Sequence, residues 1–170
     1  PQHIENASKY LFNFLKNNNF DKSVIIYSPP GVGKTTILRD LIYKLSNNAN
    51  IRYAVIDTRA EITPCIKHTE NGDFFVSYPK GTAIELATKS MTPQLIICDE
   101  ISSMEEAKEI LHSANAGVKL IATTHAYNFK ELLSKEIFKN LINNGVFDYA
   151  LGVSREYGDK KYEFTLNSLK

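Results

Sequence analysis

Short apolar runs alternate with stretches of helical periodicity along most of the chain. Apolar runs rich in β-branched residues predict buried strands at residues 24–27, 53–56, 95–98 and 120–122. Apolar residues at three- and four-residue spacing predict helices at residues 4–15, 37–45, 82–90, 104–114 and 132–142. Two more runs, 147–153 and 161–166, are joined by the turn-like segment 156–160 and predict a closing pair of strands.

This order of elements predicts an α/β fold. Strands that alternate with helices form right-handed crossover units, so we expect a mostly parallel sheet flanked by helices on both faces. No repeat and no long linker divides the sequence, and we therefore expect a single domain over residues 1–170. Within it, residues 1–20 are expected to form a leading helix, 21–145 the core and 146–170 the terminal strand pair.

The composition narrows the functional classes. Apolar residues make up 43% of the 170 residues and charged residues 23%, which is ordinary for a globular protein. The formal net charge is +1 and no basic block stands out, so charge does not favour a nucleic-acid partner. The longest apolar runs have about four residues, far fewer than the ~20 of a membrane-spanning helix.

The two cysteines, Cys65 and Cys98, do not suggest a disulfide framework, so we expect a reducing cytosol. Cys65 and His68 have ligand-like spacing, but two ligands are too few for a closed zinc site. The chain begins at Pro1 without a signal-peptide pattern, and we expect it to be part of a longer protein.

A glycine-containing segment follows the first strand and leads into a helix. Its predicted phosphate-binding residues are Pro30, Gly31, Val32, Gly33, Lys34, Thr35 and Thr36. The glycines allow the backbone to turn so that amide groups surround a phosphate, and the helix adds the positive end of its dipole. Lys34 is expected to reach the outer phosphates of ATP, the Thr35 hydroxyl to hold Mg²⁺, and Thr36 to add a donor.

Ser28 stands where such loops usually begin with glycine. It replaces only the outermost glycine, at the point where the strand becomes the loop, and Gly33, Lys34 and Thr35 are intact. We therefore predict a working nucleotide site. The alternative is a glycine-rich turn whose lysine is merely solvated.

Two acidic residues follow the strand at 95–98. If this strand lies beside the strand of the phosphate loop, Asp99 is placed to orient the water shell of Mg²⁺. Glu100 is then placed to accept a proton from the attacking water. An isolated Asp-Glu pair after a strand is more often an ordinary loop, but here it accompanies a phosphate loop.

Two further strand ends add candidate catalytic groups. His125 follows the strand at 120–122 and could contact the γ-phosphate, although a partly exposed strand-end histidine is the simpler alternative. The segment 57–61 contributes Glu61, which competes with Glu100 as the base. It also contributes Arg59, which could stabilise developing charge within the subunit or from a neighbour. A salt-bridged loop is the alternative for this segment.

Seven segments, taken together, resemble the stage III sporulation protein AA family, over about residues 4–166. They are SPPGVGKTTILRD, VIDTRAEI, YPKG, KSMTP, IICDEI, AGVKLIATTH and FDYALGVSR. The resemblance implies a RecA-like P-loop ATPase related to the motors of type II and type IV secretion, using ATP and Mg²⁺. It also implies a hexameric ring with nucleotide between subunits, and an N-terminal domain outside this chain.

The same resemblance implies a cellular role. The expected location is the cytoplasm of the mother cell in an endospore-forming bacterium. The expected partners are the membrane proteins of the channel that joins mother cell and forespore. Association with the membrane would then occur only through these partners, and no nucleic acid is expected.

The sequence departs from the family pattern at three points. Thr58 replaces an acidic residue, an arginine is missing after Asp99–Glu100, and Lys89 replaces an arginine, losing its planar fork. Two alternatives to a transport motor therefore stay open. One is a nucleic-acid-associated ATPase of the helicase-loader type, and the other is a ring scaffold that binds nucleotide with little hydrolysis.

Overall fold

A computed structural model describes residues 6–48, 50–66, 69–113, 117–155 and 161–170. Seven strands form one sheet: β1 (Val24–Ser28), β2 (Tyr53–Asp57), β3 (Gly72–Val76), β4 (Leu95–Glu100), β5 (Lys119–His125), β6 (Tyr149–Ser154) and β7 (Glu163–Ser168). The helices are α1 (Lys9–Asn17), α2 (Lys34–Ser46), α3 (Lys80–Leu86), α4 (Met104–Ser113), α5 (Phe129–Ser134) and α6 (Glu136–Asn143). A 3₁₀ turn, η1 (Thr63–Cys65), and a π-helical turn, η2 (Ala87–Met91), complete the description.

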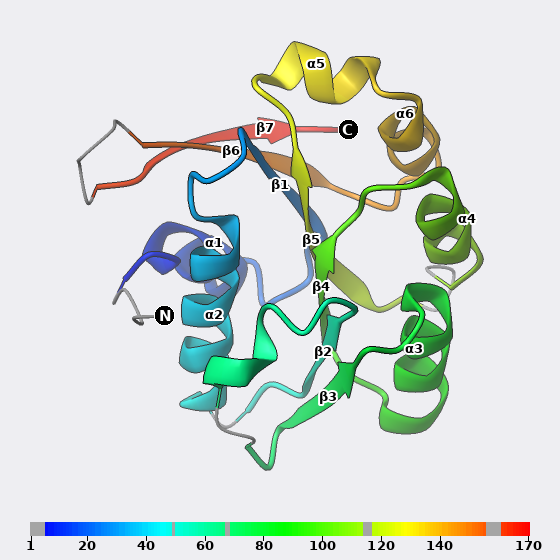
Figure 1. Ribbon diagram of the computed structural model, residues 1–170. Helices are drawn as coiled ribbons and strands as arrows, with labels where there is room; N and C mark the ends of the chain where they lie inside the picture. Colours follow the sequence, from blue (N-terminus) through cyan, green and yellow to red (C-terminus); the bar gives the residue numbers. More distant parts are fainter. Residues whose placement is uncertain (1–5, 49, 67–68, 114–116, 156–160) are drawn as a thin grey trace.

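The strand order is β3-β2-β4-β5-β1-β6-β7 (Figure 1), and every neighbouring pair is parallel except β6 and β7. The predicted α/β fold with a mostly parallel sheet is confirmed. Helices α1 and α2 cover one face, and α3, α4 and α6 cover the other (Figure 1). The antiparallel β6–β7 pair is the predicted closing pair, and its predicted turn at 156–160 lies outside the described residues.

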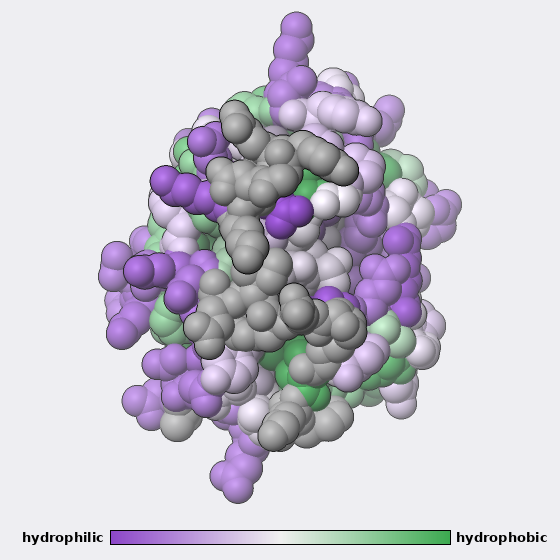
Figure 2. Space-filling view, turned by 60° about the vertical axis from the view of Figure 1, so that its left-hand side comes forward, coloured by the Kyte–Doolittle hydropathy of each residue, from purple (hydrophilic) through white to green (hydrophobic). Residues whose placement is uncertain are grey.

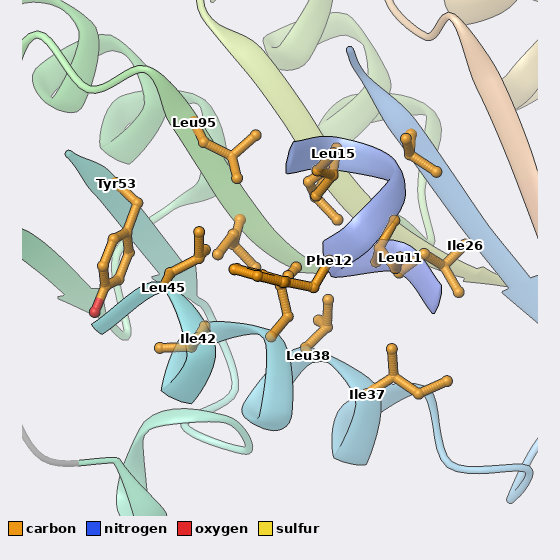
Figure 3. Packing of buried hydrophobic residues seen from close by; sticks show 14 of the residues in the cluster. Leu11, Phe12, Leu15, Ile26, Ile37, Leu38, Ile42, Leu45, Tyr53 and Leu95 are labelled. Atoms are coloured by element: carbon orange, nitrogen blue, oxygen red, sulfur yellow. The ribbon is translucent and has the colours of Figure 1, made fainter. Parts of the chain in front are cut away.

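Side chains alternate between the two faces of the sheet along the buried strands, which explains why helices cover both faces. In β1, Val24 and Ile26 join the apolar cluster under α1 and α2, whereas Ile25 and Tyr27 join the cluster on the opposite face. Figure 3 shows the first cluster, in which side chains of α1 and α2 meet those of the sheet. Because both faces of these strands are apolar, water is excluded on both sides, as expected for a parallel sheet.

Two expectations about the elements were wrong, and one strand was missed. Strand β5 lies between β1 and β4, so the strand that carries Asp99 is not beside the strand of the phosphate loop. Strand β3 was not predicted, because it is a half-buried strand paired only with β2 and begins with Gly72 and Asp73, which disfavour strands. The predicted last helix is two helices, since Lys135 between them has an extended backbone.

The surface is mainly polar on the face shown in Figure 2, where the apolar residues that are coloured form small, separate patches. Among the described residues, no helix combines the length and the apolar character that a membrane span requires.

Candidate functional site

The loop between β1 and α2 has a backbone that depends on glycine. Gly31 and Gly33 have φ angles of +78° and +118°, in the region that side chains disfavour, and Gly33 directly precedes the first residue of α2. A Cβ atom on Gly33 would lie 2.4 Å from the hydroxyl oxygen of Tyr162, so a side chain here would have to displace the Tyr162 ring. A Cβ atom on Gly31 would meet nothing within 4 Å. The space in front of the Gly31 backbone is therefore open.

A cavity of about 320 Å³ lies at this loop, at the carboxyl ends of the parallel strands. It brings together most of the predicted site residues, which come from four strand ends: Gly31, Gly33, Lys34, Thr35, Arg59, Glu61, Asp99, Glu100 and His125. Leu38, Ile62 and Thr123 complete its lining. Pro30, Val32 and Thr36 lie in the same loop and helical turn but are not among the described residues that line the cavity.

Lys34 is buried and its ammonium group is held by its own loop. Its Nζ atom lies 3.1 Å from Ser28 Oγ, 3.3 Å from the Ser28 carbonyl oxygen and 3.4 Å from the Pro29 carbonyl oxygen. Burial lowers the pKa of Lys34 to about 8, and the charge of Glu100 opposes this shift while that of Lys135 adds to it. Ser28, which replaces the usual glycine, thus accepts hydrogen bonds from the Lys34 ammonium group.

His125 connects Lys34 to Glu100. Its Nδ1 atom lies 2.8 Å from Lys34 Nζ, and its Nε2 atom lies 3.2 Å from Glu100 Oε2. A protonated lysine can only donate, so Nδ1 accepts and the ring proton of the neutral histidine sits on Nε2, where it is donated to Glu100. Arg59 Nη1 lies 3.5 Å from the same carboxylate oxygen, and Arg59 also donates to Ser102. Glu100 is therefore oriented from two sides.

Asp99 is buried, and each of its two carboxylate oxygens accepts hydrogen bonds from two donors. Oδ2 accepts from the backbone amides of Thr58 (2.7 Å) and Arg59 (3.3 Å). Oδ1 accepts from the Thr58 hydroxyl (3.0 Å) and from Lys80 Nζ (2.7 Å). A carboxylate has about four acceptor positions, so Asp99 could orient a metal-bound water only by exchanging one of these donors. Thr58, which replaces an acidic residue of the family pattern, supplies two of them.

The loop after β2 is anchored by Asp57, which is fully buried. Its carboxylate accepts hydrogen bonds from the backbone amides of Glu61, Ile62 and Thr63, at 2.8–2.9 Å, and from the Thr63 hydroxyl. Ala60 within this loop has a φ angle of +53°, a conformation that costs energy for a residue with a side chain. Asp57 thus fixes the backbone that carries Arg59 and Glu61 to the cavity.

Lys80 is a site residue that the sequence reasoning missed. Only 2% of it is exposed, and Nζ contacts Asp99, Glu106 Oε1 (3.0 Å) and the carbonyl oxygen of Glu100. Burial alone would lower its pKa, but Cys98, Asp99 and Glu106 raise it above the ordinary value. Burial raises the pKa of Cys98 to about 12, so its thiol is neutral near neutral pH. The carboxylates of Asp99 and Glu106 are therefore the groups that raise the pKa of Lys80. The segment YPKG was part of the family resemblance, but no pattern in it indicated a buried ion pair.

The remaining candidates lie away from the cavity or outside the described parts. Lys89 is exposed on η2 and pairs with Glu85, and His112 is exposed on α4. His3, His68 and the side chain of Cys65 are outside the described residues. Within the described part of the chain, no group of three or more His, Cys, Asp or Glu side chains could hold a metal ion by itself.

The family model for sporulation stage III, protein AA, matches residues 2–162. The chain belongs to this family. It is 31% identical over 158 residues to stage III sporulation protein AA of Bacillus subtilis strain 168, an alignment that covers 87% of the chain and 51% of that relative. The chain thus spans about half the length of this member of the sporulation protein AA family.

Solved structures of secretion ATPases have the same fold. The Legionella pneumophila ATPase DotB superimposes with a TM-score of 0.65 at 16% identity, over 95% of the chain and 50% of DotB. The VirB11 ATPase of the Brucella suis type IV secretion system, solved with sulphate, gives 0.65 at 16% identity, over 98% of the chain and 59% of VirB11. The RecA-like P-loop fold expected from the family resemblance is confirmed.

Proposed function

We propose that the chain binds Mg-ATP at the β1–α2 loop and hydrolyses it, and that this hydrolysis drives assembly of, or transport through, the mother cell–forespore channel. The observation that carries the proposal is the cavity at the carboxyl ends of the strands. Lys34 and Thr35 of the β1–α2 loop line it together with Asp99, Glu100 and His125. The membership in a sporulation family and the fold of secretion ATPases support the direction of this proposal.

The loop fits a phosphate chain. Gly31 leaves open space in front of its backbone, and the amino end of the 13-residue helix α2 follows directly. Lys34 is the cation at this end, and we propose that it exchanges its contacts with Ser28, Pro29 and His125 for the outer phosphates. An anion would thus be bound by amides, a helix end and one ammonium group.

Thr35 and Asp99 are the residues that would hold Mg²⁺, since both line the cavity and offer oxygen atoms. When bound, the ion would neutralise charge that develops on the phosphates. Two protein ligands suffice, because Mg²⁺ usually keeps several waters and takes phosphate oxygens as well. Asp99 takes part by exchanging one donor, and the neutral hydroxyl of Thr58 is the easiest to replace.

Glu100 is the general base that we propose. Its carboxylate is oriented by His125 and Arg59 beside the phosphate loop, so it is placed to accept a proton from water. Once Lys34 leaves for a phosphate, Nδ1 of His125 loses its donor, and the histidine can report the state of the phosphate site to Glu100. Glu61 is the alternative base, carried on the loop that Asp57 anchors.

The rest of the proposal follows from the family. We propose a homo-oligomeric ring, with hexamers as the expected form, in which ATP and ADP bind between subunits. Arg59 is then a candidate to act across the interface, because 48% of its side chain is exposed. The proposed partners are membrane proteins of the channel, on the cytoplasmic side of the mother cell.

A second candidate function is a ring scaffold that binds nucleotide with little hydrolysis. The saturated carboxylate of Asp99 favours it, because a metal-bound water would have to displace an existing donor. Phosphate release by the full-length protein, measured with Mg-ATP and again with EDTA, separates the two. Magnesium-dependent turnover supports the motor. Tight binding without turnover, with a partner protein present, supports the scaffold.

A further inference from the structure

Strand β4 contains an irregularity directly before the candidate base. Ile97 pairs with Ile121 and Glu100 pairs with Thr123, so β4 has one residue more than β5 between the two pairs. Such a bulge re-aims the side chains that follow it and often lies next to an active site. Here the bulged stretch contains Cys98 and Asp99. The directions of Asp99 and Glu100 therefore depend on what stabilises this stretch.

Lys80 contacts Asp99 within that stretch and Glu100 directly after it. Its ammonium group lies 2.7 Å from the Asp99 side chain and also donates to the carbonyl oxygen of Glu100. The contact with Asp99 holds a side chain, and the contact with Glu100 holds the backbone from which the proposed base projects. A single ammonium group, with three donors, thus connects the side chain of Asp99 with the backbone of Glu100.

The third donor of Lys80 reaches α4. Glu106 Oε1 accepts this hydrogen bond from Lys80, and Glu106 Oε2 accepts hydrogen bonds from the backbone amides of Ser102 and Ser103. The hydroxyl of Ser103 accepts a hydrogen bond from the Glu106 amide in return, which completes a capping box at the start of α4. Glu106 is therefore fixed by the helix end, and it holds Lys80 in place rather than following it.

The first residues of α3 are also docked against α4. The Gly81 amide donates to Glu109 Oε2 at 2.8 Å, and a Cβ atom on Gly81 would lie 2.4 Å from Glu109 Cβ. Only glycine allows this close approach. The backbone of Lys80 is thus held against α4 at the point from which its side chain extends to β4.

We infer that Lys80 is a positioning residue for the proposed magnesium and base carboxylates, acting by fixing the bulged end of β4. This inference rests on the proposed nucleotide site. Lys80 need not touch nucleotide, because its three partners are Asp99, Glu100 and Glu106. Its loss would leave the Asp99 and Glu106 carboxylates without their shared cation and would release the Glu100 carbonyl oxygen, so the bulged end of β4 would no longer be fixed.

The test is calorimetric binding of ADP to the full-length protein, once with Mg²⁺ and once with EDTA. For the wild type, the ratio of the two affinities gives the contribution of the ion. We expect Lys80→Met to reduce that ratio by about 10-fold to 100-fold, the usual effect of removing a residue that orients a metal ligand. Affinity in EDTA should stay within about twofold, since the phosphate loop is untouched, and Lys80→Arg should restore part of the ratio. Lys108→Met, at an exposed lysine of α4, is the matched control and should behave as the wild type.

The double variant Lys80→Met/Glu106→Gln covers the case in which Lys80→Met does not fold, because it also removes one of the unpaired carboxylates. It should fold and still lack the magnesium contribution, whereas Glu106→Gln alone should keep most of it. An unchanged ratio in the Lys80 variants, or an equal loss with and without Mg²⁺, would overturn the role of Lys80 alone. Absence of ADP binding by the folded wild type would instead overturn the proposed function, and this inference with it.

Discussion

The ammonium nitrogen of Lys34 lies 2.8 Å from Nδ1 of His125. This contact joins the cation of the phosphate loop to a ring whose other nitrogen faces the carboxylate of Glu100. In the proposed mechanism, a phosphate competes with His125 and with the Ser28 and Pro29 oxygens for the three donors of Lys34, so occupation of the loop and the hydrogen bonding of His125 would be coupled. The coupling gives the strand-end histidine a defined place in the proposed mechanism.

Glu100→Gln should separate binding from hydrolysis. Glutamine keeps the size of the side chain but accepts protons poorly, so we expect Mg-ATP affinity within a few-fold of the wild type. Turnover should fall by about 10²-fold to 10⁴-fold, the usual contribution of a general base. Nucleotide affinity and phosphate release are the measurements. Glu61→Gln is the comparison, and a large loss there with normal turnover in Glu100→Gln would transfer the base role to Glu61.

Ser28→Ala should strengthen nucleotide binding. The Ser28 hydroxyl lies 3.1 Å from the Lys34 ammonium in this structure and competes with phosphate for it. A hydrogen bond to a charged group contributes about 1.5–3 kcal/mol, so we expect affinity for Mg-ADP to rise about 10-fold to 100-fold. Weaker binding by the variant would mean that Ser28 assists the bound state instead of competing with it.

Asp57→Ala should destabilise the fold and loosen the loop that carries Arg59 and Glu61. Three backbone amides lose their acceptor inside the protein, and a buried unsatisfied donor costs about 1–3 kcal/mol. We expect the free energy of unfolding in urea to fall by about 3 kcal/mol or more. Asp57→Asn keeps one acceptor oxygen and should lose less. Equal stability of Asp57→Ala and the wild type would refute the anchoring role.

Asp148 should give the protein a pH-dependent part of its stability in acid. Burial tends to raise its pKa, but the hydrogen bonds from Lys170 and from the Ser23 amide outweigh this and leave the pKa below its ordinary value. Since the folded state holds the proton less tightly than the unfolded state, this stability is present above about pH 4. It is lost as the pH falls through the lower folded-state pKa. Urea unfolding from pH 6 to pH 2.5 should therefore show the difference between wild type and Asp148→Asn shrinking in acid, with Glu105→Gln, at an exposed position of α4, as the control variant. A constant difference for Asp148→Asn would contradict the assignment.

The parts of the fold that sequence predicts are those with local causes. Strand β1 is apolar on both faces and precedes a loop whose glycines and lysine are readable as a motif. Strand β3 escaped prediction because its residues are half-buried and its pairing with β2 is not local. The break at Lys135 is likewise tertiary, since the side chain of that residue reaches the carbonyl oxygen of His125.

The candidate site divides in the same way. Motif spacing named the phosphate loop, Asp99, Glu100 and His125, and the structure places them around one cavity. Lys80 lacked a signal, because a lysine just before a predicted helix is normally exposed. Only the three-dimensional meeting of β4, α3 and α4 makes it a buried partner of Asp99. The saturation of Asp99 by Thr58 was equally invisible, since it requires the loop after β2 to lie across the end of β4.

Calorimetric titration of the folded, full-length protein with Mg-ADP tests the central claim most directly. We predict binding to the wild type, and a loss of about 10-fold to 100-fold in affinity for Lys34→Ala, because hydrogen bonds to charged groups contribute about 1.5–3 kcal/mol. Lys139→Ala, at an exposed lysine of α6, should bind as the wild type does. If the folded wild type gives no heat of binding at millimolar nucleotide, or if Lys34→Ala binds as tightly as the wild type, the loop does not hold phosphate as described.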